Sequence, residues 1–210
     1  MSTRTTTAGP NRRTVLRTGA ALAAVPAAVA IAPSIDVQLR EWIVGQDEAI
    51  AAVSAAIERL RLGQTDGRRP AASFLFLGPA GVGKTHLAKA AAEVAFGTRD
   101  ALTRIDMRRA TNLSSLVETL RQRPRQVALF DEVDKAQQEA LGWLKTLLET
   151  GRLADTLGQA ADLRESLVLT TSRRVTPSIA FLTGLAQSVT FRPLSPPQRA
   201  EVARRMTRAT

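Results

Sequence analysis

Cysteine is absent from this sequence of 210 residues, and histidine occurs once. Without cysteine the chain forms no disulfide, zinc–thiolate site or iron–sulfur cluster, and it has no thiol nucleophile. A metal site built from several histidines is excluded as well. Aromatic residues make up only 4% of the chain, so stacking platforms for single-stranded nucleic acid are scarce.

The overall composition is that of a globular domain. Apolar residues make up 44% of the chain and charged residues 23%, which excludes a disordered or collagen-like chain and is enough to build a core. The formal net charge is +10, and 25 of the 29 basic residues are arginine. Because the arginines are dispersed, the charge favours polyanions in general but identifies no particular one. A function on nucleic acid would therefore rest on charge alone, and we predict no specific nucleic acid partner.

The N-terminal segment has no acidic residue before Asp36. Its apolar stretch, residues 20–32, has 13 residues, fewer than the ~20 that span a bilayer, so no transmembrane span is predicted. Arg12-Arg13 and the later Ala28-Val29-Ala30 are in the order of a twin-arginine export signal with a cleavage site. An alanine-rich linker has the same composition, and these residues leave both interpretations open. We therefore divide the chain into a basic, alanine-rich leader or signal-like segment, 1–35, and a domain, 36–210.

From residue 36 onward, short apolar runs alternate with segments of helical periodicity. This alternation predicts an α/β fold, in which a parallel sheet is sandwiched between helices. The predicted strands are 73–77, 102–107, 127–130, 167–171 and 188–191. The predicted helices are 50–60, 87–94, 113–120, 136–148 and 197–206.

A phosphate-binding loop is the strongest signal in the chain. Residues 78–85 match G-x-x-x-x-G-K-[ST] between a predicted strand and a predicted helix, the context that gives this motif meaning. Its glycines let backbone N–H groups approach phosphates, and the N-terminus of the helix adds partial positive charge. Lys84 is expected to reach the β- and γ-phosphates and to serve catalysis, and Thr85 to ligate Mg²⁺. The predicted nucleotide-binding residues here are Gly78, Pro79, Ala80, Gly81, Val82, Gly83, Lys84 and Thr85.

Two carboxylates follow the apolar run 127–130. The carboxyl ends of parallel strands are where open α/β sheets bind ligands. Asp131 is therefore predicted to hold Mg²⁺ directly or through water, and Glu132 to be the catalytic base that polarises an attacking water. Together with the loop, they predict a P-loop NTPase that uses ATP and Mg²⁺.

The stretch 43–49, Ile-Val-Gly-Gln-Asp-Glu-Ala, resembles the second ATPase module of Clp-type AAA+ unfoldases and disaggregases. So do the strand and loop 73–85, the run 131–136, the segment 150–155 and Phe-Arg-Pro-Leu at 191–194. The resemblance implies an AAA+ large subdomain, with Ile43 and Val44 flanking the adenine. It also implies ATP-driven protein remodelling in hexameric rings.

The sequence departs from this family at four places. The family's long stretch with an aromatic pore loop is replaced by a short segment, 108–122, without an aromatic residue. When residues are counted without gaps from the matching motifs, Arg173 takes the position of the family's sensor asparagine. In the same way, Gly184 takes the position of the family's arginine finger. The family's helical lid would begin where this sequence ends, and we expect the lid to be absent.

These departures leave two functions open. The first is an ATP-binding Clp-type AAA+ protein whose hydrolysis is weak or depends on a partner, and which acts in protein remodelling. The second is a non-enzymatic switch or regulator of Clp-type rings that binds ATP or ADP. The expected partners are nucleotide and a complete Clp-type ATPase. Since ATP is a cytoplasmic resource, we expect a cytoplasmic location, with twin-arginine export as the alternative.

Overall fold

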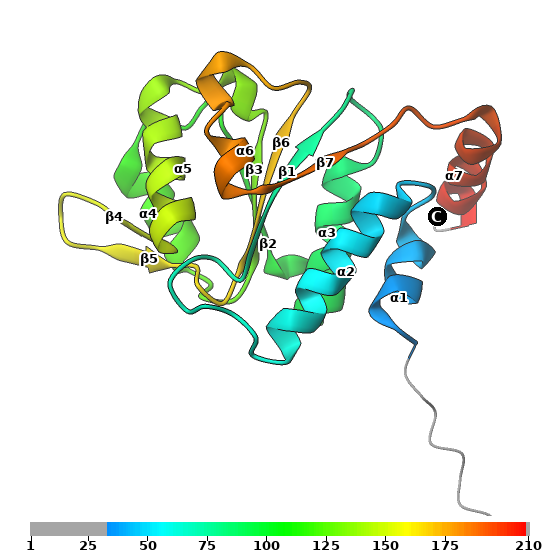
Figure 1. Ribbon diagram of the computed structural model, residues 1–210, viewed down its shortest axis with the longest axis horizontal. Coiled ribbons are helices and arrows are strands. Elements are labelled where there is room, and N and C mark those ends of the chain that lie inside the picture. The colour runs from blue at the N-terminus through cyan, green and yellow to red at the C-terminus, as the bar shows by residue number, and fades with distance from the viewer. Residues whose placement is uncertain (1–32, 209–210) are drawn as a thin grey trace, which may run out of the picture. The chain divides into compact units, whose positions relative to one another are not determined.

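The computed structural model describes residues 33–208, so the export-signal prediction lies outside the described residues. The first helix of the described residues is α1 (Ile35–Trp42). Figure 1 shows the elements that follow. In chain order they are α2 (Asp47–Arg61), β1 (Ala72–Leu77), α3 (Lys84–Phe96), η1 (Arg99–Ala101), β2 (Leu102–Asp106), α4 (Leu113–Arg121), β3 (Val127–Asp131), η2 (Val133–Lys135), α5 (Gln138–Thr150), β4 (Arg152–Ala154), β5 (Ala160–Asp162), β6 (Leu167–Ser172), η3 (Pro177–Ile179), α6 (Leu182–Leu185), β7 (Gln187–Thr190) and α7 (Pro196–Arg208).

Five of the strands form a sheet in the order β2-β3-β6-β1-β7, and every neighbouring pair is parallel. Strand β6 lies between β3 and β1. Their carboxyl ends therefore meet at one edge, which brings residues that are far apart in sequence to the same place.

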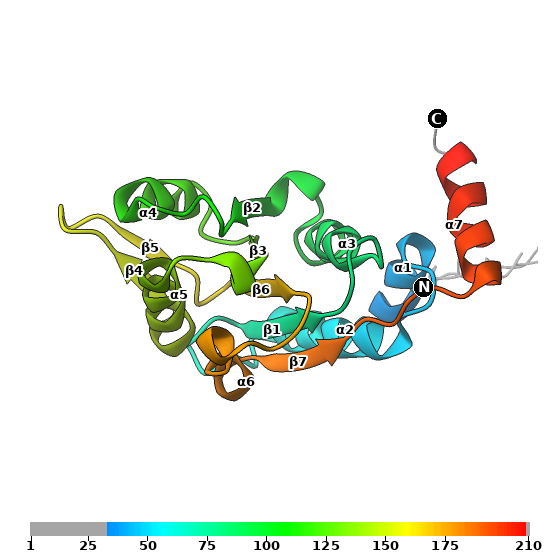
Figure 2. The ribbon, with the colours of Figure 1, turned by 90° about the horizontal axis from the view of Figure 1, so that it is seen from above.

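Helices cover both faces of this sheet, as Figure 2 shows from above. Successive side chains of a strand point to opposite faces. Phe74 and Phe76 pack with α1, α2 and α3 in one core cluster, whereas Leu75 packs with α4, α5 and α6 in the other. The predicted α/β sandwich is thus confirmed.

Among the local features that differ from the sequence prediction are helix α1, the β4–β5 hairpin and the start of α5. Helix α1 was assigned to no element, although Ile35, Leu39 and Ile43 are buried at a spacing of four. The antiparallel hairpin of β4 and β5 was not predicted either. Helix α5 begins at Gln138 rather than residue 136, because Val133–Lys135 forms a 3₁₀ turn and residue 136 has extended backbone.

Candidate nucleotide-binding site

The predicted phosphate loop joins β1 to the N-terminus of α3. Its first residue is fixed from two sides. The Gly78 N–H donates to the Ser172 carbonyl oxygen over 3.1 Å, and a Cβ on Gly78 would lie 2.4 Å from the Phe191 carbonyl oxygen. Gly78, Gly81 and Gly83 all have positive φ angles, which favour glycine. Only a chain with glycine at Gly78 can lie this close to the segment after β7.

Lys84 opens helix α3, and its ammonium group lies inside the loop. The Nζ atom donates to the carbonyl oxygens of Gly78 and Pro79, each over 2.7 Å. Burial lowers the pKa of Lys84, because a charged ammonium loses hydration there. Two of its three donors are therefore held by the loop, and the third is available to an anion.

Asp131 ends β3 and is anchored through both carboxylate oxygens. Arg104 on β2 donates to Oδ2 from Nε over 3.0 Å and from Nη2 over 2.5 Å. The Thr171 hydroxyl on β6 donates to Oδ1. A carboxylate oxygen has two acceptor positions, so the two Arg104 donors occupy those of Oδ2, whereas Oδ1 can still accept from a metal-bound water.

Glu132 has a left-handed backbone, with φ of 58°. Its N–H donates to the Thr171 hydroxyl over 3.0 Å. Its carboxylate lies between two cations: Lys135 at 2.9 Å from Oε1 and Arg108 at 2.9 Å from Oε2. The carboxylate of Glu132, the predicted catalytic base, is thus neutralised by Lys135 and Arg108 of the same chain.

Arg108 also forms a two-pronged ion pair with Asp106, with distances of 3.0 and 2.8 Å. The hydrogen bonds from Arg108 lower the pKa of Asp106 to about 2. Asp106 is therefore ionised at neutral pH, and it holds Arg108 at the entrance to the site.

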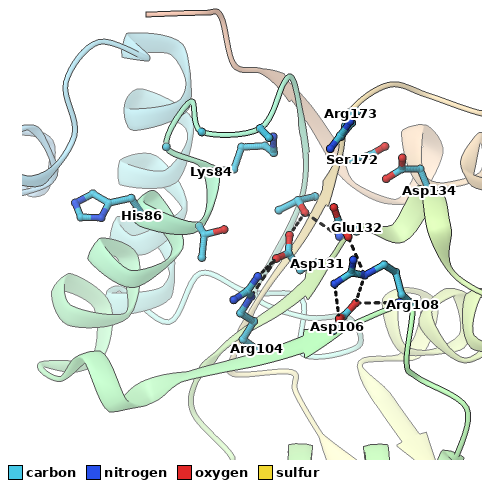
Figure 3. A pocket seen from close by; sticks show the side chains of 15 residues that line it. Lys84, His86, Arg104, Asp106, Arg108, Asp131, Glu132, Asp134, Ser172 and Arg173 are labelled. Carbon is cyan, nitrogen blue, oxygen red and sulfur yellow. Dashed lines mark hydrogen bonds and ion pairs between the residues drawn. The ribbon is translucent and has the colours of Figure 1, made fainter. Parts of the chain in front are cut away.

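These groups surround a polar cavity of about 430 Å³, shown in Figure 3. In that view Asp131 and Glu132 lie between Lys84 and Arg173 on one side and Arg104 and Arg108 on the other. The residues that line the cavity are Ala80, Gly81, Gly83, Lys84, Thr85, His86, Arg104, Asp106, Arg108, Asp131, Glu132, Asp134, Thr171, Ser172 and Arg173.

A second cavity, of about 420 Å³, shares Gly81, Gly83 and His86 with the first. Its lining is mostly apolar and includes both predicted adenine neighbours. The lining residues are Glu41, Trp42, Ile43, Val44, Gly81, Val82, Gly83, His86, Leu194, Val202 and Arg205.

Gln46 and Arg205 fix the walls of this apolar cavity. The Gln46 side-chain amide donates to the Arg192 carbonyl oxygen over 2.8 Å and accepts from the Arg192 N–H over 3.1 Å. Arg205 on α7 donates to the carbonyl oxygens of Arg40 and Glu41, each over 2.9 Å. The segment 43–46 is thereby tied to the chain after β7, and α7 is tied to α1.

The two cavities together match the chemistry of Mg-ATP. The apolar cavity suits a base, and the polar one suits a triphosphate. Within residues 33–208 no three carboxylates or imidazoles gather into a metal site of their own. A magnesium ion held by Thr85 and Asp131 would complete its shell with phosphate oxygens and water, as Mg²⁺ usually does. One oxygen of Asp134, which lines the polar cavity, is buried without a hydrogen-bond partner among the described residues.

Most of the residues named from sequence come together here. Lys84, Thr85, Asp131 and Glu132 line the polar cavity; Ile43, Val44 and Val82 line the apolar one. Sequence reasoning missed the strand-end residues Arg104, Asp106 and Thr171 and the neighbouring Arg108. They reach the site because β2 and β6 flank β3 in the sheet and end at the same edge, a strand order that the sequence alone does not give. Trp143 packs against a core cluster, whereas Trp42 is partly exposed at the apolar cavity.

Two of the residues predicted to depart from the family pattern, Arg173 and Gly184, have different positions. Arg173 directly follows β6 and lines the polar cavity. Gly184 lies exposed on α6 and lines neither cavity described above. Helix α4 (Leu113–Arg121) lies within the segment 108–122, which we predict to replace the family's longer stretch.

A parallel sheet, a phosphate loop before a helix, and an acidic strand end beside that loop define a P-loop NTPase. The AAA domain (Cdc48 subfamily) matches residues 69–120 and 110–181 of this chain. The chain therefore belongs to the AAA domain family and is a Clp-type AAA+ ATPase domain.

Individual relatives are Clp chaperones. The chain is 40% identical over 157 residues to chaperone protein ClpB of Leptolyngbya boryana, covering 66% of this chain and 18% of that protein. It is 43% identical over 153 residues to ClpB of Oceanobacillus iheyensis, covering 64% of this chain and 19% of the relative. It is 40% identical over 158 residues to chloroplastic ClpC3 of Oryza sativa, covering 66% and 17%. The chain thus spans less than a fifth of the length of these relatives.

Proposed function

We propose that this chain binds Mg-ATP and Mg-ADP at the two joined cavities and hydrolyses ATP weakly or only with a partner, in the service of protein remodelling. One observation carries the proposal. Lys84 and Thr85, at the start of α3, face Asp131 and Glu132 across a polar cavity that continues into an apolar one. The chain belongs to the AAA family, and proteins of that family generally use ATP.

In this proposal the binding step uses residues that are all in place. The loop N–H groups and Lys84 hold the phosphates, and Thr85 and Asp131 hold the magnesium ion, which neutralises phosphate charge. The Ile43 and Val44 side chains shield the base from water.

Isothermal titration calorimetry of the full chain tests the binding step. The variant Lys84→Ala removes a charged donor worth about 1.5–3 kcal/mol, so we expect ATP affinity to fall by about 10- to 150-fold. Lys89→Ala is the matched control, because Lys89 lies on the same helix, is exposed and lines neither cavity. Absence of nucleotide binding by the unmodified chain would refute the proposal.

The hydrolytic step is proposed to be slow for two reasons. Lys135 and Arg108 compete with water for the Glu132 carboxylate, and no finger arginine is available at Gly184. In related P-loop enzymes a finger arginine is worth about 10³–10⁵ in rate. Steady-state phosphate release by the full chain should therefore be low, and lower still in Glu132→Gln. Fast turnover that depends on Glu132 would contradict the assigned effect of Gly184 and Arg173.

The second candidate, a non-enzymatic regulator of Clp-type rings, is favoured by the same pairing of Glu132 with Arg108 and Lys135. A complete Clp-type partner would then donate its own finger to the site around Lys84. We expect the chain alone not to unfold a tagged fluorescent protein, and we expect it to alter the ATPase rate of a complete Clp-type ATPase from the same cell. Unchanged rates on mixing would remove this candidate, and unfolding by the chain alone would refute its dependence on a partner.

A cytoplasmic location is proposed because ATP is available there. Within residues 33–208 no helix combines the length and the hydropathy needed to cross a bilayer. Fusing residues 1–35 to a reporter that is active only after export tests the location. Export that depends on Arg12 and Arg13 would show the alternative to be correct.

A further inference from the structure

The polar cavity has an uneven balance of charge. Arg104 pairs with Asp131, and Arg108 pairs with Asp106 and Glu132. Arg173 lines the same cavity, yet within residues 33–208 its guanidinium group makes no ion pair or hydrogen bond. A guanidinium has five donors and is always charged. Arg173 is therefore a cation at the site without an acidic partner among the described residues.

The backbone fixes Arg173 next to the phosphate loop. The residue before it, Ser172, accepts from the Gly78 N–H through its carbonyl oxygen over 3.1 Å. The Ser172 hydroxyl donates to the Arg174 carbonyl oxygen over 2.7 Å, which turns the chain directly after β6. The start of the Arg173 side chain is thus fixed relative to Gly78, and Figure 3 shows Arg173 and Lys84 on the same side of the cavity.

The neighbouring charges repel each other. The positive charge of Arg173 adds to the effect of burial in lowering the pKa of Lys84. Lys84 and Arg173 face the same cavity, and the only described hydrogen-bond partners of the Lys84 ammonium are two loop carbonyl oxygens. Two cations placed in this way favour an anion between them.

The position of Arg173 indicates which part of a nucleotide it would meet. The apolar cavity shares Gly81, Gly83 and His86 with the polar cavity but does not include Arg173. Arg173 instead lies on the side of Glu132, Thr171 and Ser172. A nucleotide with its base in the apolar cavity would extend its phosphates along the loop, so its terminal phosphate would lie nearest to Arg173.

We propose that Arg173 binds the terminal phosphate of a nucleoside triphosphate, so that this site discriminates triphosphate from diphosphate through a residue of its own chain. This inference rests on the proposed nucleotide binding. The flat guanidinium can donate two parallel hydrogen bonds to phosphate oxygens. It has no acceptor with which to orient an attacking water. Arg173 therefore favours a retained triphosphate over a rapidly hydrolysed one.

The test compares affinities rather than turnover. Titration calorimetry of the full chain uses the Mg²⁺ complexes of ADP and of the non-hydrolysable β,γ-imido analogue of ATP. In Arg173→Ala we expect the affinity for the triphosphate analogue to fall about 10- to 100-fold, equivalent to about 1.4–2.8 kcal/mol. The affinity for ADP should change by less than about threefold. Arg173→Lys, which keeps the charge but loses the flat fork, should lie between the two.

Arg174→Ala is the matched control. Arg174 is the next residue, is exposed and does not line the cavity, so its removal should leave both affinities unchanged. Circular dichroism and the thermal midpoint check that each variant folds. Since the Arg173 side chain is exposed, we expect no change in either measurement.

The outcomes separate this inference from the proposed function. If the unmodified chain binds neither nucleotide, both fail. If it binds both with a dependence on Lys84 and Arg173→Ala weakens them equally, or weakens neither, only the role of Arg173 is refuted. A loss of discrimination in Arg174→Ala would also refute it, because the effect would then reflect general charge.

Discussion

Replacing Thr171 with valine removes the hydroxyl that joins the two acidic residues at the end of β3. This hydroxyl donates to Asp131 Oδ1 and accepts the Glu132 N–H over 3.0 Å. Thr171 is 1% exposed, so water cannot replace either bond at that position. Valine has nearly the same shape, so the change tests the hydroxyl and not the packing.

The expected cost can be worked out from these two bonds. A hydrogen bond to a charged group contributes about 1.5–3 kcal/mol and a neutral one about 0.5–1.5 kcal/mol. We therefore expect Thr171→Val to lower the free energy of unfolding by about 2–4.5 kcal/mol. In urea denaturation this should appear as a lower midpoint with an unchanged m value. Thr171→Ser keeps the hydroxyl and loses one methyl group, which costs about 0.8 kcal/mol.

Thr170→Val is the matched control. Thr170 is the neighbouring residue on β6 and is equally buried, but its hydroxyl makes one neutral hydrogen bond, to the Phe74 carbonyl oxygen over 3.0 Å. Its loss should cost about 0.5–1.5 kcal/mol, and Mg-nucleotide affinity should not change. If the two valine variants unfold within about 0.5 kcal/mol of each other, the reasoning about Thr171, Asp131 and Glu132 is refuted.

Two further predictions concern the finger position and the hairpin. Gly184→Arg should be tolerated, because a Cβ there meets no atom within 4 Å. Arginine should stabilise the helix by up to about 1 kcal/mol relative to glycine. A lower thermal midpoint for this variant would show that the side chain does not fit. At Asp162, hydrogen bonds from Arg164 first and then Arg152 lower the pKa, so its stabilising effect is present above the unfolded pKa near 4 and is lost as pH falls toward the lower folded pKa. Asp162→Asn should remove this part of the acid dependence measured by urea denaturation, whereas an unchanged pH profile would contradict it.

The sheet was predictable because its strands carry a plain signal. Runs such as Phe74-Leu75-Phe76 and Leu129-Phe130 are apolar on both faces, and each helix between them shows a periodicity of three to four residues. These patterns follow from burial under helices on two sides. The same logic failed for the hairpin, whose strands have three residues each. Only Leu153 and Ala161 in it face the core, so no run was long enough to detect.

The candidate site was predictable in part for a similar reason. The loop and the Asp131-Glu132 pair are local in sequence, and their context gives them meaning. The arginines that neutralise those carboxylates come from β2 and from the turn after it. Their pairing depends on which strand lies next to which, and a chain with 25 arginines offers many equal candidates. The structure shows that β2 pairs with β3 and that Asp106 lies opposite Asp131, which brings the residues of β2 next to the carboxylates at the end of β3.

Nucleotide binding and nucleotide hydrolysis depend on different parts of this site. The groups assigned to binding follow directly from β1 and β3 and match the pattern of the Clp-type family. The groups assigned to hydrolysis are Glu132, which follows β3 and is paired with Arg108 and Lys135, and the finger position Gly184, which lies on α6. Because these sets of residues barely overlap, one can change while the other is kept. The two proposed functions share the residues assigned to binding and differ only in what a partner supplies to the residues assigned to hydrolysis. The rate of ATP hydrolysis with and without a complete Clp-type ATPase is therefore the measurement that separates them.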